Sequence, residues 1–167
     1  TQSFGCVRFV YNLGLETKIS AYMSQKKNLF FFDLCKQMKE LKDTEAPWLS
    51  NCPSQSLQCS LKNLDSAYNQ FFKGKGFPKF KNKYSKQSLQ FPQKVKIDFE
   101  NNIIFLPKLK KVSIDFSRQF KGEIKTCTVS KTTTGKYFIS ILVDNQKELP
   151  LKLSISSETT VGIDMGV

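Results

Sequence analysis

The chain has 167 residues, of which 40% are hydrophobic and 15 are Phe, which is enough apolar material for one ordinary domain or two small ones and excludes wholesale disorder. No stretch approaches the roughly 18 consecutive apolar residues of a transmembrane helix, and no secretory signal is visible, so we expect a cytoplasmic protein. The sequence starts at Thr1 rather than at an initiator Met, and we expect a segment clipped from a longer protein. The absence of histidine excludes a His-dependent catalytic triad within this chain.

The net charge of +12 is concentrated in one part of the chain. Residues 73–121 carry 13 basic and 3 acidic side chains, whereas residues 1–72 have a net charge of only +2 and residues 122–167 have none. Such a local excess predicts a surface for a polyanion. Only Arg8 and Arg118 are arginines, and lysine binds phosphate as a point charge, so we expect contacts to a nucleic-acid backbone rather than sequence reading.

Five cysteines occur without any C-x-x-C pair, at positions Cys6, Cys35, Cys52, Cys59 and Cys127. Their odd number and mostly apolar surroundings predict buried free thiols in a reducing compartment. Without histidine or clustered cysteines, we expect no structural zinc site in this segment.

The first half of the sequence predicts three helices. Apolar residues recur every three to four positions over residues 2–24, and Gly14 within this pattern suggests a close helix contact. A second helix is expected over residues 33–42, with Asp33 in its first turn. The preceding Phe30-Phe31-Phe32 is either a staple into the core or a platform for stacking bases.

A third helix is predicted from the capping residues at 51–54 to about Phe72. Gln55, Gln58 and Lys62 recur on its exposed side near the start. Polar amides on a first helical turn can meet adenine edges or phosphate, and an ordinary solvated face is the alternative.

A basic segment, residues 73–83, ends the helical part because Gly74, Gly76 and Pro78 stop the helix. In an extended chain Lys79, Lys81 and Lys83 would share one face and Phe80 would point to the other. We therefore expect one side to anchor the segment and the other to meet phosphates.

After Tyr84 the hydrophobic period changes to two. Strands are predicted around residues 89–91, 95–99, 103–105, 112–116, 122–131 and 136–144, with a weaker candidate at 149–155. Turns are expected at Asn101-Asn102 and at residues 132–135. The fold class is therefore α+β, a helical subdomain followed by a small antiparallel β-barrel.

The sequence ends in an apolar run that carries Asp164 between Gly162 and Gly166. This is typical of a buried strand that presents one carboxylate, which can hold a hard cation or take part in phosphate chemistry. Gly-Ile-Asp-x-Gly strands occur in RNase-H-like nucleases and in the actin and sugar-kinase superfold. The basic segment that precedes this strand favours the nuclease.

The order of several motifs along the chain resembles the TnpB (OrfB) family, transposon-encoded proteins related to type V CRISPR effectors. The motifs are FGCVRFVYN at 4–12, WL at 48–49, PSQSLQ at 53–58, LKNLDSAY at 61–68, FF at 71–72, GFPKFK at 76–81, LPKL at 106–109 and VGIDMG at 161–166. The resemblance covers nearly the whole chain and implies the recognition portion of an RNA-guided DNA endonuclease.

The resemblance implies three parts: a helical REC-like subdomain at 1–72, a wedge (WED) barrel at 73–156, and the start of a RuvC-like nuclease domain at 157–167. It implies a guide RNA from the transposon's right end and double-stranded target DNA as partners, DNA recombination as the setting, and a prokaryotic, nucleoid-associated protein. The residues implied to face a target-adjacent DNA motif are Phe31, Cys35, Ser54, Gln55, Gln58 and Pro92. Those implied to contact nucleic-acid backbone are Arg8, Lys73, Lys75, Lys79, Lys81 and Lys83.

Asp164 matches the first carboxylate of the family's Asp-Glu-Asp set, which holds Mg²⁺. The Glu, the second Asp and the family's zinc-binding segment are not in this chain, and the family's first wedge strand would precede Thr1. We therefore expect the chain alone to cut no DNA and its barrel to be incomplete at one edge. Two other readings stay open: a nuclease-inactive guided DNA-binding regulator or transposition accessory protein, and an actin-like phosphotransferase fragment.

Overall fold

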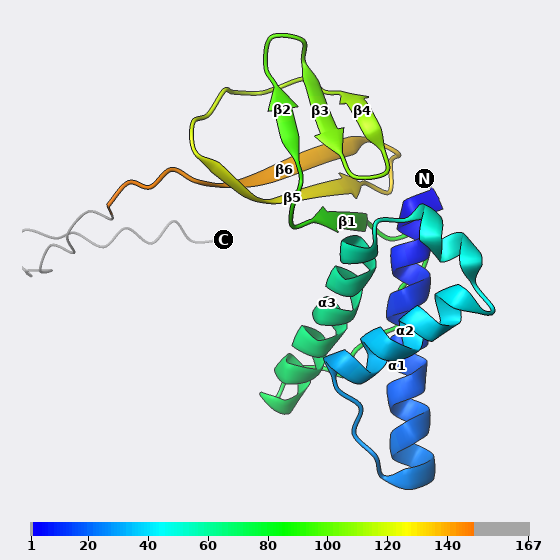
Figure 1. Cartoon of the computed structure of the whole chain (residues 1–167). Coiled ribbons are helices and arrows are strands. Elements are labelled where there is room, and N and C mark those ends of the chain that lie inside the picture. The colour runs from blue at the N-terminus through cyan, green and yellow to red at the C-terminus, as the bar shows by residue number, and fades with distance from the viewer. Residues whose placement is uncertain (1, 149–167) are drawn as a thin grey trace, which may run out of the picture.

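The computed structural model describes residues 2–148, which form an α+β structure with the helices on one side and the strands on the other (Figure 1). The helices are α1 (Gln2–Gln25), α2 (Phe31–Asp43), the 3₁₀ turn η1 (Pro47–Asn51) and α3 (Ser54–Phe72). The strands are β1 (Gln87–Phe91), β2 (Lys96–Asp98), β3 (Ile103–Leu106), β4 (Lys110–Ser113), β5 (Glu123–Lys131) and β6 (Tyr137–Asp144). The three predicted helices and six of the predicted strands are thus confirmed, whereas residues 149–155 lie outside the described part.

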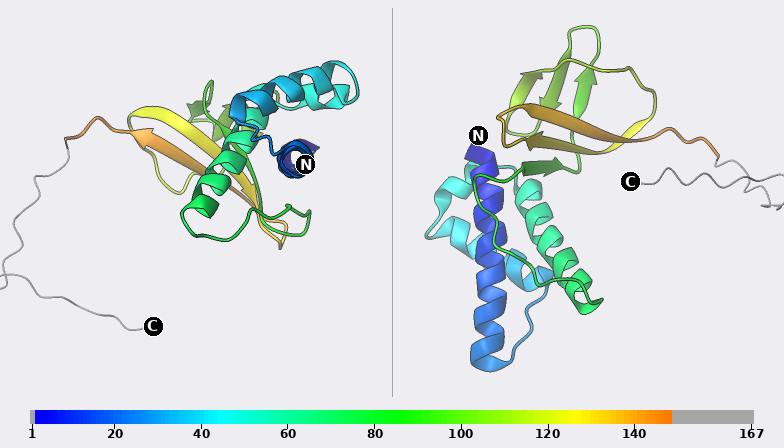
Figure 2. Two further views of the ribbon diagram at one scale, coloured as in Figure 1. Left: turned by 90° about the horizontal axis from the view of Figure 1, so that it is seen from below. Right: turned by 180° about the vertical axis from the view of Figure 1, so that it is seen from behind.

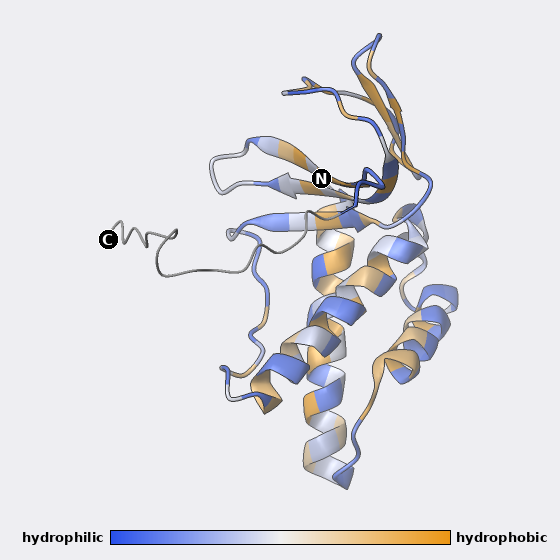
Figure 3. Ribbon diagram, turned by 90° about the vertical axis from the view of Figure 1, so that its left-hand side faces the viewer, coloured by the Kyte–Doolittle hydropathy of each residue, from blue (hydrophilic) through white to orange (hydrophobic). Residues whose placement is uncertain are grey.

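Helices α1 and α3 lie side by side and run in the same direction, and α2 with η1 returns the chain to the level at which α1 began (Figures 1 and 2). Their contact is built from leucines with almost no exposed surface, among them Leu15, Leu57, Leu61 and Leu64. Leu57, Leu61 and Leu64 recur at helical spacing, so α3 buries one stripe and carries polar residues on much of its remaining surface, as the alternating colours in Figure 3 show, whereas α1 also exposes Phe9 and Met23.

Gly14 allows α1 to approach α3 closely. A methyl group at this position would lie 2.9 Å from Leu61 Cδ2 and 3.1 Å from Leu64 Cδ2. The close helix contact suggested by the sequence is therefore confirmed, and it explains a glycine that otherwise weakens a helix by about 1 kcal/mol relative to alanine.

One antiparallel sheet has the strand order β1-β5-β6. Leu89 pairs with Val129 and Phe91 pairs with Cys127, so the two buried residues of β1 stand beside the partly buried Val129 and the buried Cys127 of β5. Strand β1 also contacts α1 and α3, and it joins this sheet to the helices. At the start of β5, Gly122 has φ +134° and a Cβ there would lie 2.4 Å from the Asp144 carbonyl oxygen, so only glycine fits.

The second antiparallel sheet has the order β2-β3-β4 and its core residues are Ile104 and Leu106. The predicted turn at Asn101-Asn102 is confirmed. The Asp98 carboxylate accepts hydrogen bonds from the Asn101 backbone N–H (3.0 Å) and from its side-chain amide (2.8 Å), and Asn102 takes a left-handed φ of 53°. These contacts lower the pKa of Asp98, the Asn101 side-chain hydrogen bond having the largest effect.

The strands do not form the predicted barrel, which was expected to be open at one edge only, and this prediction is wrong for residues 2–148. Their ladders form two separate three-stranded sheets, and no backbone pairing links one sheet to the other within that range. Alternating residues and tight turns specify hairpins, which are local. Closure depends on pairing between strands far apart in sequence, which that pattern does not encode.

Candidate nucleic-acid interface

The Lys-rich strap, which we define as residues 73–86, leaves the end of α3 and runs back along the helices to β1 (Figures 1 and 2). Asn12 on α1 holds it with two hydrogen bonds to the backbone of Lys81. The Asn12 Nδ2 donates to the Lys81 carbonyl (2.9 Å), and the Lys81 N–H donates to Asn12 Oδ1 (2.8 Å). This pairing imitates a β-ladder, so a segment without regular secondary structure still has a fixed position.

Two further contacts fix the strap. Pro78 is buried, and at the end of the strap Arg8 Nη1 donates to Gln87 Oε1 at 2.9 Å. Gln87 in turn donates from Nε2 to the Lys83 carbonyl at 3.0 Å. The predicted anchor was Phe80, but 56% of that residue is exposed. The anchor is instead the buried Pro78 together with the backbone of Lys81, which pairs with Asn12 on α1.

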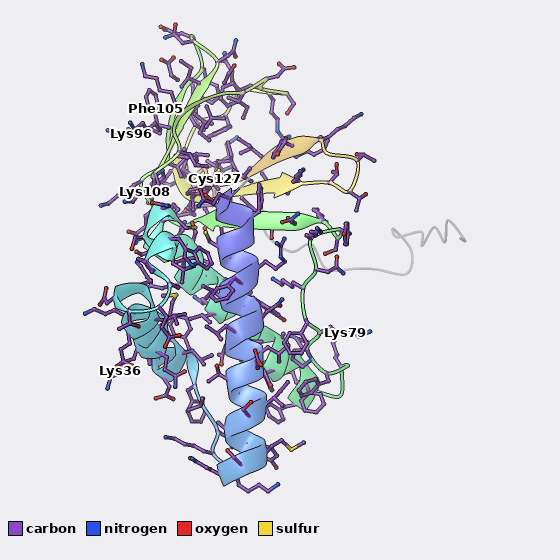
Figure 4. All side chains as sticks on the ribbon, turned by 90° about the vertical axis from the view of Figure 1, so that its right-hand side faces the viewer. Lys36, Lys79, Lys96, Phe105, Lys108 and Cys127 are labelled. Atoms are coloured by element: carbon purple, nitrogen blue, oxygen red, sulfur yellow. The ribbon has the colours of Figure 1, made fainter. Side chains whose placement is uncertain are left out.

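Lys81 differs from the lysines on either side of it. Its Nζ lies 3.9 Å from the centroid of the Tyr11 ring, although the residue as a whole remains exposed. Burial of the ammonium against α1 lowers the pKa of Lys81. Lys79 has no comparable ring contact and extends away from the helices (Figure 4). Lys81 therefore lies against α1, whereas Lys83 Nζ lies 5.0 Å from the centroid of the neighbouring Tyr84 ring, and a shared face of lysines stays a prediction.

The strap lysines have no carboxylate partner within the part of the chain that the structure describes. The ion pairs there are those of Lys125 with Glu123 (2.6 Å) and with Asp144 (3.7 Å), at the far end of β5. Lys73 and Lys75, which follow the last turn of α3, are exposed like Lys79 and Lys83. A run of unneutralised ammonium groups on a fixed backbone is suited to a phosphate chain.

Aromatic rings accompany the lysines at the start of the strap. Phe77 contacts Phe71 and Tyr68 edge to face, with ring centroids 5.2 and 5.6 Å apart. Phe72 is 75% exposed beside them. Exposed rings next to cations form the kind of surface on which single-stranded bases stack.

A second basic surface surrounds the sheet β2-β3-β4. It comprises the exposed lysines Lys94, Lys96, Lys108, Lys110 and Lys111. Figure 4 shows Lys96 and Lys108 at the edge of the molecule opposite Lys79. Lys94, Lys108 and Lys110 have φ between 60° and 65°, a left-handed backbone that lysine adopts at a cost of roughly 1–2 kcal/mol each. The composition shows these charges, but only the backbone angles show that three of the lysines adopt a left-handed conformation that glycine or asparagine would adopt at lower cost.

The residues assigned to a DNA motif divide into two groups. Gln55 Nε2 donates to Gln93 Oε1 at 3.0 Å, which places the start of α3 beside the segment after β1 that contains Pro92. Ser54 accepts a hydrogen bond from Lys42 Nζ (3.1 Å). Gln58 is exposed on the same helix, so this group forms one polar surface.

The other group lies on α2 and is largely packed. Phe31 and Cys35 are half-buried against the core, and burial raises the pKa of the Cys35 thiol. The core interpretation of the three phenylalanines holds for Phe31, which packs inward, whereas Phe30 and Phe32 are 66% and 82% exposed and their role in stacking stays a prediction.

A polar pocket of about 240 Å³ lies between α1, α3 and the end of the strap, and nothing in the sequence pattern pointed to it. Its lining residues come from three segments: Phe4, Val7 and Arg8; Ser56, Cys59, Ser60 and Asn63; and Lys81, Asn82, Ser85, Lys86, Gln87, Ser88 and Gln90. No Asp or Glu lines it, whereas one arginine and two lysines do. The pocket is therefore suited to an anion.

The predicted catalytic and metal-binding residue, Asp164, lies outside the described residues. Within residues 2–148, no three His, Cys, Asp or Glu side chains gather as a metal ion would require. Burial raises the pKa of Cys52 to about 12 and that of Cys127 to about 11, as expected of free buried thiols. None of the helices in the described range combines the length and apolar character that a bilayer crossing requires.

Comparison with known proteins adds three findings. Residues 1–27, which include α1, match the helix-turn-helix domain of the OrfB IS605 family. The chain is 39% identical over 165 residues, 98% of its length, to an Escherichia coli (strain K12) protein named "Putative RNA-guided DNA endonuclease InsQ". It is 30% identical over 173 aligned positions, spanning all of its length, to a Streptomyces pristinaespiralis protein named "Putative RNA-guided DNA endonuclease".

The resemblance to the TnpB (OrfB) family is confirmed. The chain spans 40% of the length of the first of these two relatives and 42% of the length of the second. The matched helix-turn-helix segment contributes the helix that carries Arg8 and Asn12, the two residues that hold the strap.

Proposed function

We propose that this chain is the nucleic-acid-recognition portion of a transposon-associated RNA-guided DNA endonuclease. The observation that carries the proposal is the strap, whose lysines lack carboxylate partners among residues 2–148 and whose backbone is fixed to α1 through Asn12. The names of the two relatives support the same activity for the longer proteins that they describe.

The two basic surfaces lie on opposite edges (Figure 4), and we assign the strap to the guide RNA. Lys73, Lys75, Lys79 and Lys83 with Arg8 would contact the backbone of a guide RNA from the transposon's right end, or of its duplex with target DNA. Because lysine reads charge and not bases, sequence choice would be left to base pairing. Lys81, held against Tyr11, would support the strap more than it contacts phosphate.

A target-adjacent DNA motif would be read by the polar surface at the start of α3. Gln58 is exposed and free to bond a base edge, while Gln55 is positioned by Gln93. Phe31 and Cys35 would act mainly by packing α2 against the core, since both are half-buried. We assign residues 1–72 to a helical REC-like subdomain and residues 73–156 to a wedge domain, whose described residues form two open sheets.

We assign residues 157–167 to the start of a RuvC-like nuclease domain, with Asp164 as one carboxylate ligand of Mg²⁺. When bound, Mg²⁺ would polarise a phosphodiester for in-line cleavage. The further ligands are not supplied by the described residues, so we expect this chain alone to cut no DNA. Incubation with Mg²⁺ and plasmid should show no cleavage above that of an Asp164→Ala variant, and a clear difference between the two would contradict the assignment.

The salt dependence of binding tests the proposal. Affinity for a single-stranded RNA should fall with salt, and each phosphate contact should add about −0.7 to the slope of log K against log salt. Replacing Lys79 and Lys83 with Gln should flatten the slope by about 1.4, since two contacts are removed. The matched control replaces Lys36 and Lys39 with Gln, two exposed lysines on α2.

Two outcomes would overturn the proposal. A slope near zero for the unmodified chain would mean that phosphates are not contacted. An equal flattening by the α2 control would mean that the charge of the whole molecule, and not the strap, controls binding.

A further inference from the structure

The polar pocket between α1, α3 and the strap has a floor and a rim of different character. Four lining residues, Phe4, Val7, Ser56 and Ser60, are buried and form the floor. The serine hydroxyls of this floor are already used, because Ser56 Oγ donates to the Gln90 carbonyl and Ser60 Oγ donates to the Val7 carbonyl, each at 2.6 Å. The floor therefore offers apolar contact and no unsatisfied donor to a ligand.

The rim, in contrast, carries groups that can make further hydrogen bonds. Arg8 uses one N–H on Gln87 and keeps the others. Asn63 makes only a long bond of 3.3 Å to Gln90 Oε1, which leaves its carbonyl oxygen free. Lys86 is exposed at the mouth of the pocket and has no carboxylate partner within residues 2–148. The rim can thus pair with an anion and with the edge of a planar polar group.

We propose that this pocket holds one unstacked nucleotide of a single strand, with the base on the floor and its phosphate on Arg8 and Lys86. The inference rests on the proposed function and adds a subsite to it. The whole pocket, of about 240 Å³, has room for roughly eight waters at about 30 Å³ each and thus for one base, and Phe4 and Val7 offer apolar contact to the face of that base. A base within a duplex cannot enter, because its faces are stacked and its edge is paired.

The position of the pocket supports this assignment. It opens beside the final residues of the strap, where Asn82 accepts hydrogen bonds from the Tyr84 and Ser85 backbone N–H groups, each at 2.9 Å. That turn directs the chain toward β1 and sets Ser85 and Lys86 in the pocket wall. A strand whose phosphates follow Lys79 and Lys83 would therefore pass the mouth of the pocket, and one of its bases could turn inward.

Filling the pocket without changing charge tests the proposal. Asn63→Leu places an apolar side chain in the rim, and Asn69→Leu is the matched control, an exposed asparagine of the same helix that does not line the pocket. Asn63→Leu should weaken binding of a short oligouridylate about tenfold, within the range of one lost base contact. Its affinity for an RNA duplex of equal length, and the slope of log K against log salt, should stay unchanged.

A second readout does not depend on a variant. An oligouridylate that contains 4-thiouridine should crosslink under ultraviolet light to the α3 peptide that contains Cys59, which lines the pocket. Three outcomes would contradict nucleotide binding in the pocket: Asn63→Leu loses equal affinity for single strand and duplex, Asn63→Leu loses no affinity, or no crosslink to that peptide forms. If the unmodified chain binds neither probe, the proposed function fails as well; binding with an intact salt slope but no effect of Asn63→Leu defeats the pocket alone.

Discussion

The pairing of Asn12 with the strap leads to a prediction about binding without any change of charge. Asn12→Ala removes both hydrogen bonds to the Lys81 backbone and leaves every lysine in place. A hydrogen bond contributes about 0.5–1.5 kcal/mol net, and these two are exposed, so the strap should lose roughly 1–2 kcal/mol of docking free energy. Because about 1.4 kcal/mol corresponds to a factor of ten, the open strap becomes about tenfold more populated.

The direct assay is hydrogen exchange of the Lys81 amide, whose N–H is the donor to Asn12 Oδ1. Its exchange should accelerate about tenfold in Asn12→Ala, and affinity for single-stranded RNA should fall by up to the same factor if the docked strap is the binding form. Asn69→Ala is the control, since this exposed asparagine of α3 makes no side-chain hydrogen bond to the strap within residues 2–148. Unchanged exchange of the Lys81 amide would show that Asn12 does not hold the strap. Faster exchange with unchanged affinity would show that the docked strap is not needed for binding.

Two other predictions concern stability. Gly5→Ala in α1 should stabilise the fold by about 0.5–1 kcal/mol, because nothing lies within 4 Å of the new methyl group. Gly14→Ala should be about 1–3 kcal/mol less stable than Gly5→Ala, because its methyl group meets Leu61 and Leu64. Equal urea midpoints for the two variants would contradict the packing argument. Burial raises the pKa of Cys52 from 9.0 to about 12. Below pH 9 the thiol is neutral in both the folded and the unfolded chain, and its contribution to the free energy of unfolding is complete. As the pH rises from 9 toward 12, the thiol ionises first in the unfolded chain, and this contribution is lost. Urea unfolding at about pH 8 and pH 10 should show a loss about 1 kcal/mol larger for the unmodified chain than for Cys52→Ala, and identical losses would contradict the shift.

The helices could be predicted closely because their signal is local. The predicted ranges 2–24 and 33–42 became Gln2–Gln25 and Phe31–Asp43. The hairpins were also predictable, since Asp98 and Asn101 make their contacts within four residues. The barrel was not, because pairing between distant strands depends on the free energy of the whole fold and not on alternation within each strand.

The site was predictable only in its charge. The count of lysines in residues 73–121 predicted a polyanion surface, but the strap's anchor was assigned to Phe80, whereas Pro78 and Asn12 provide it. Asn12 lies 69 positions from Lys81, and no sequence spacing links the two. The pocket was missed for the same reason, since its walls come from three separate segments.

The helical stripes, the strand alternation, the excess of lysine and the resemblance to TnpB could all be found from residue types and their order along the chain. Which lysine is free and which lies against a ring depends on the folded arrangement, as the contrast between Lys79 and Lys81 shows. Burial and hydrogen bonding are properties of neighbours in space. A lysine becomes a phosphate contact or a structural support according to which surface the folded chain brings next to it.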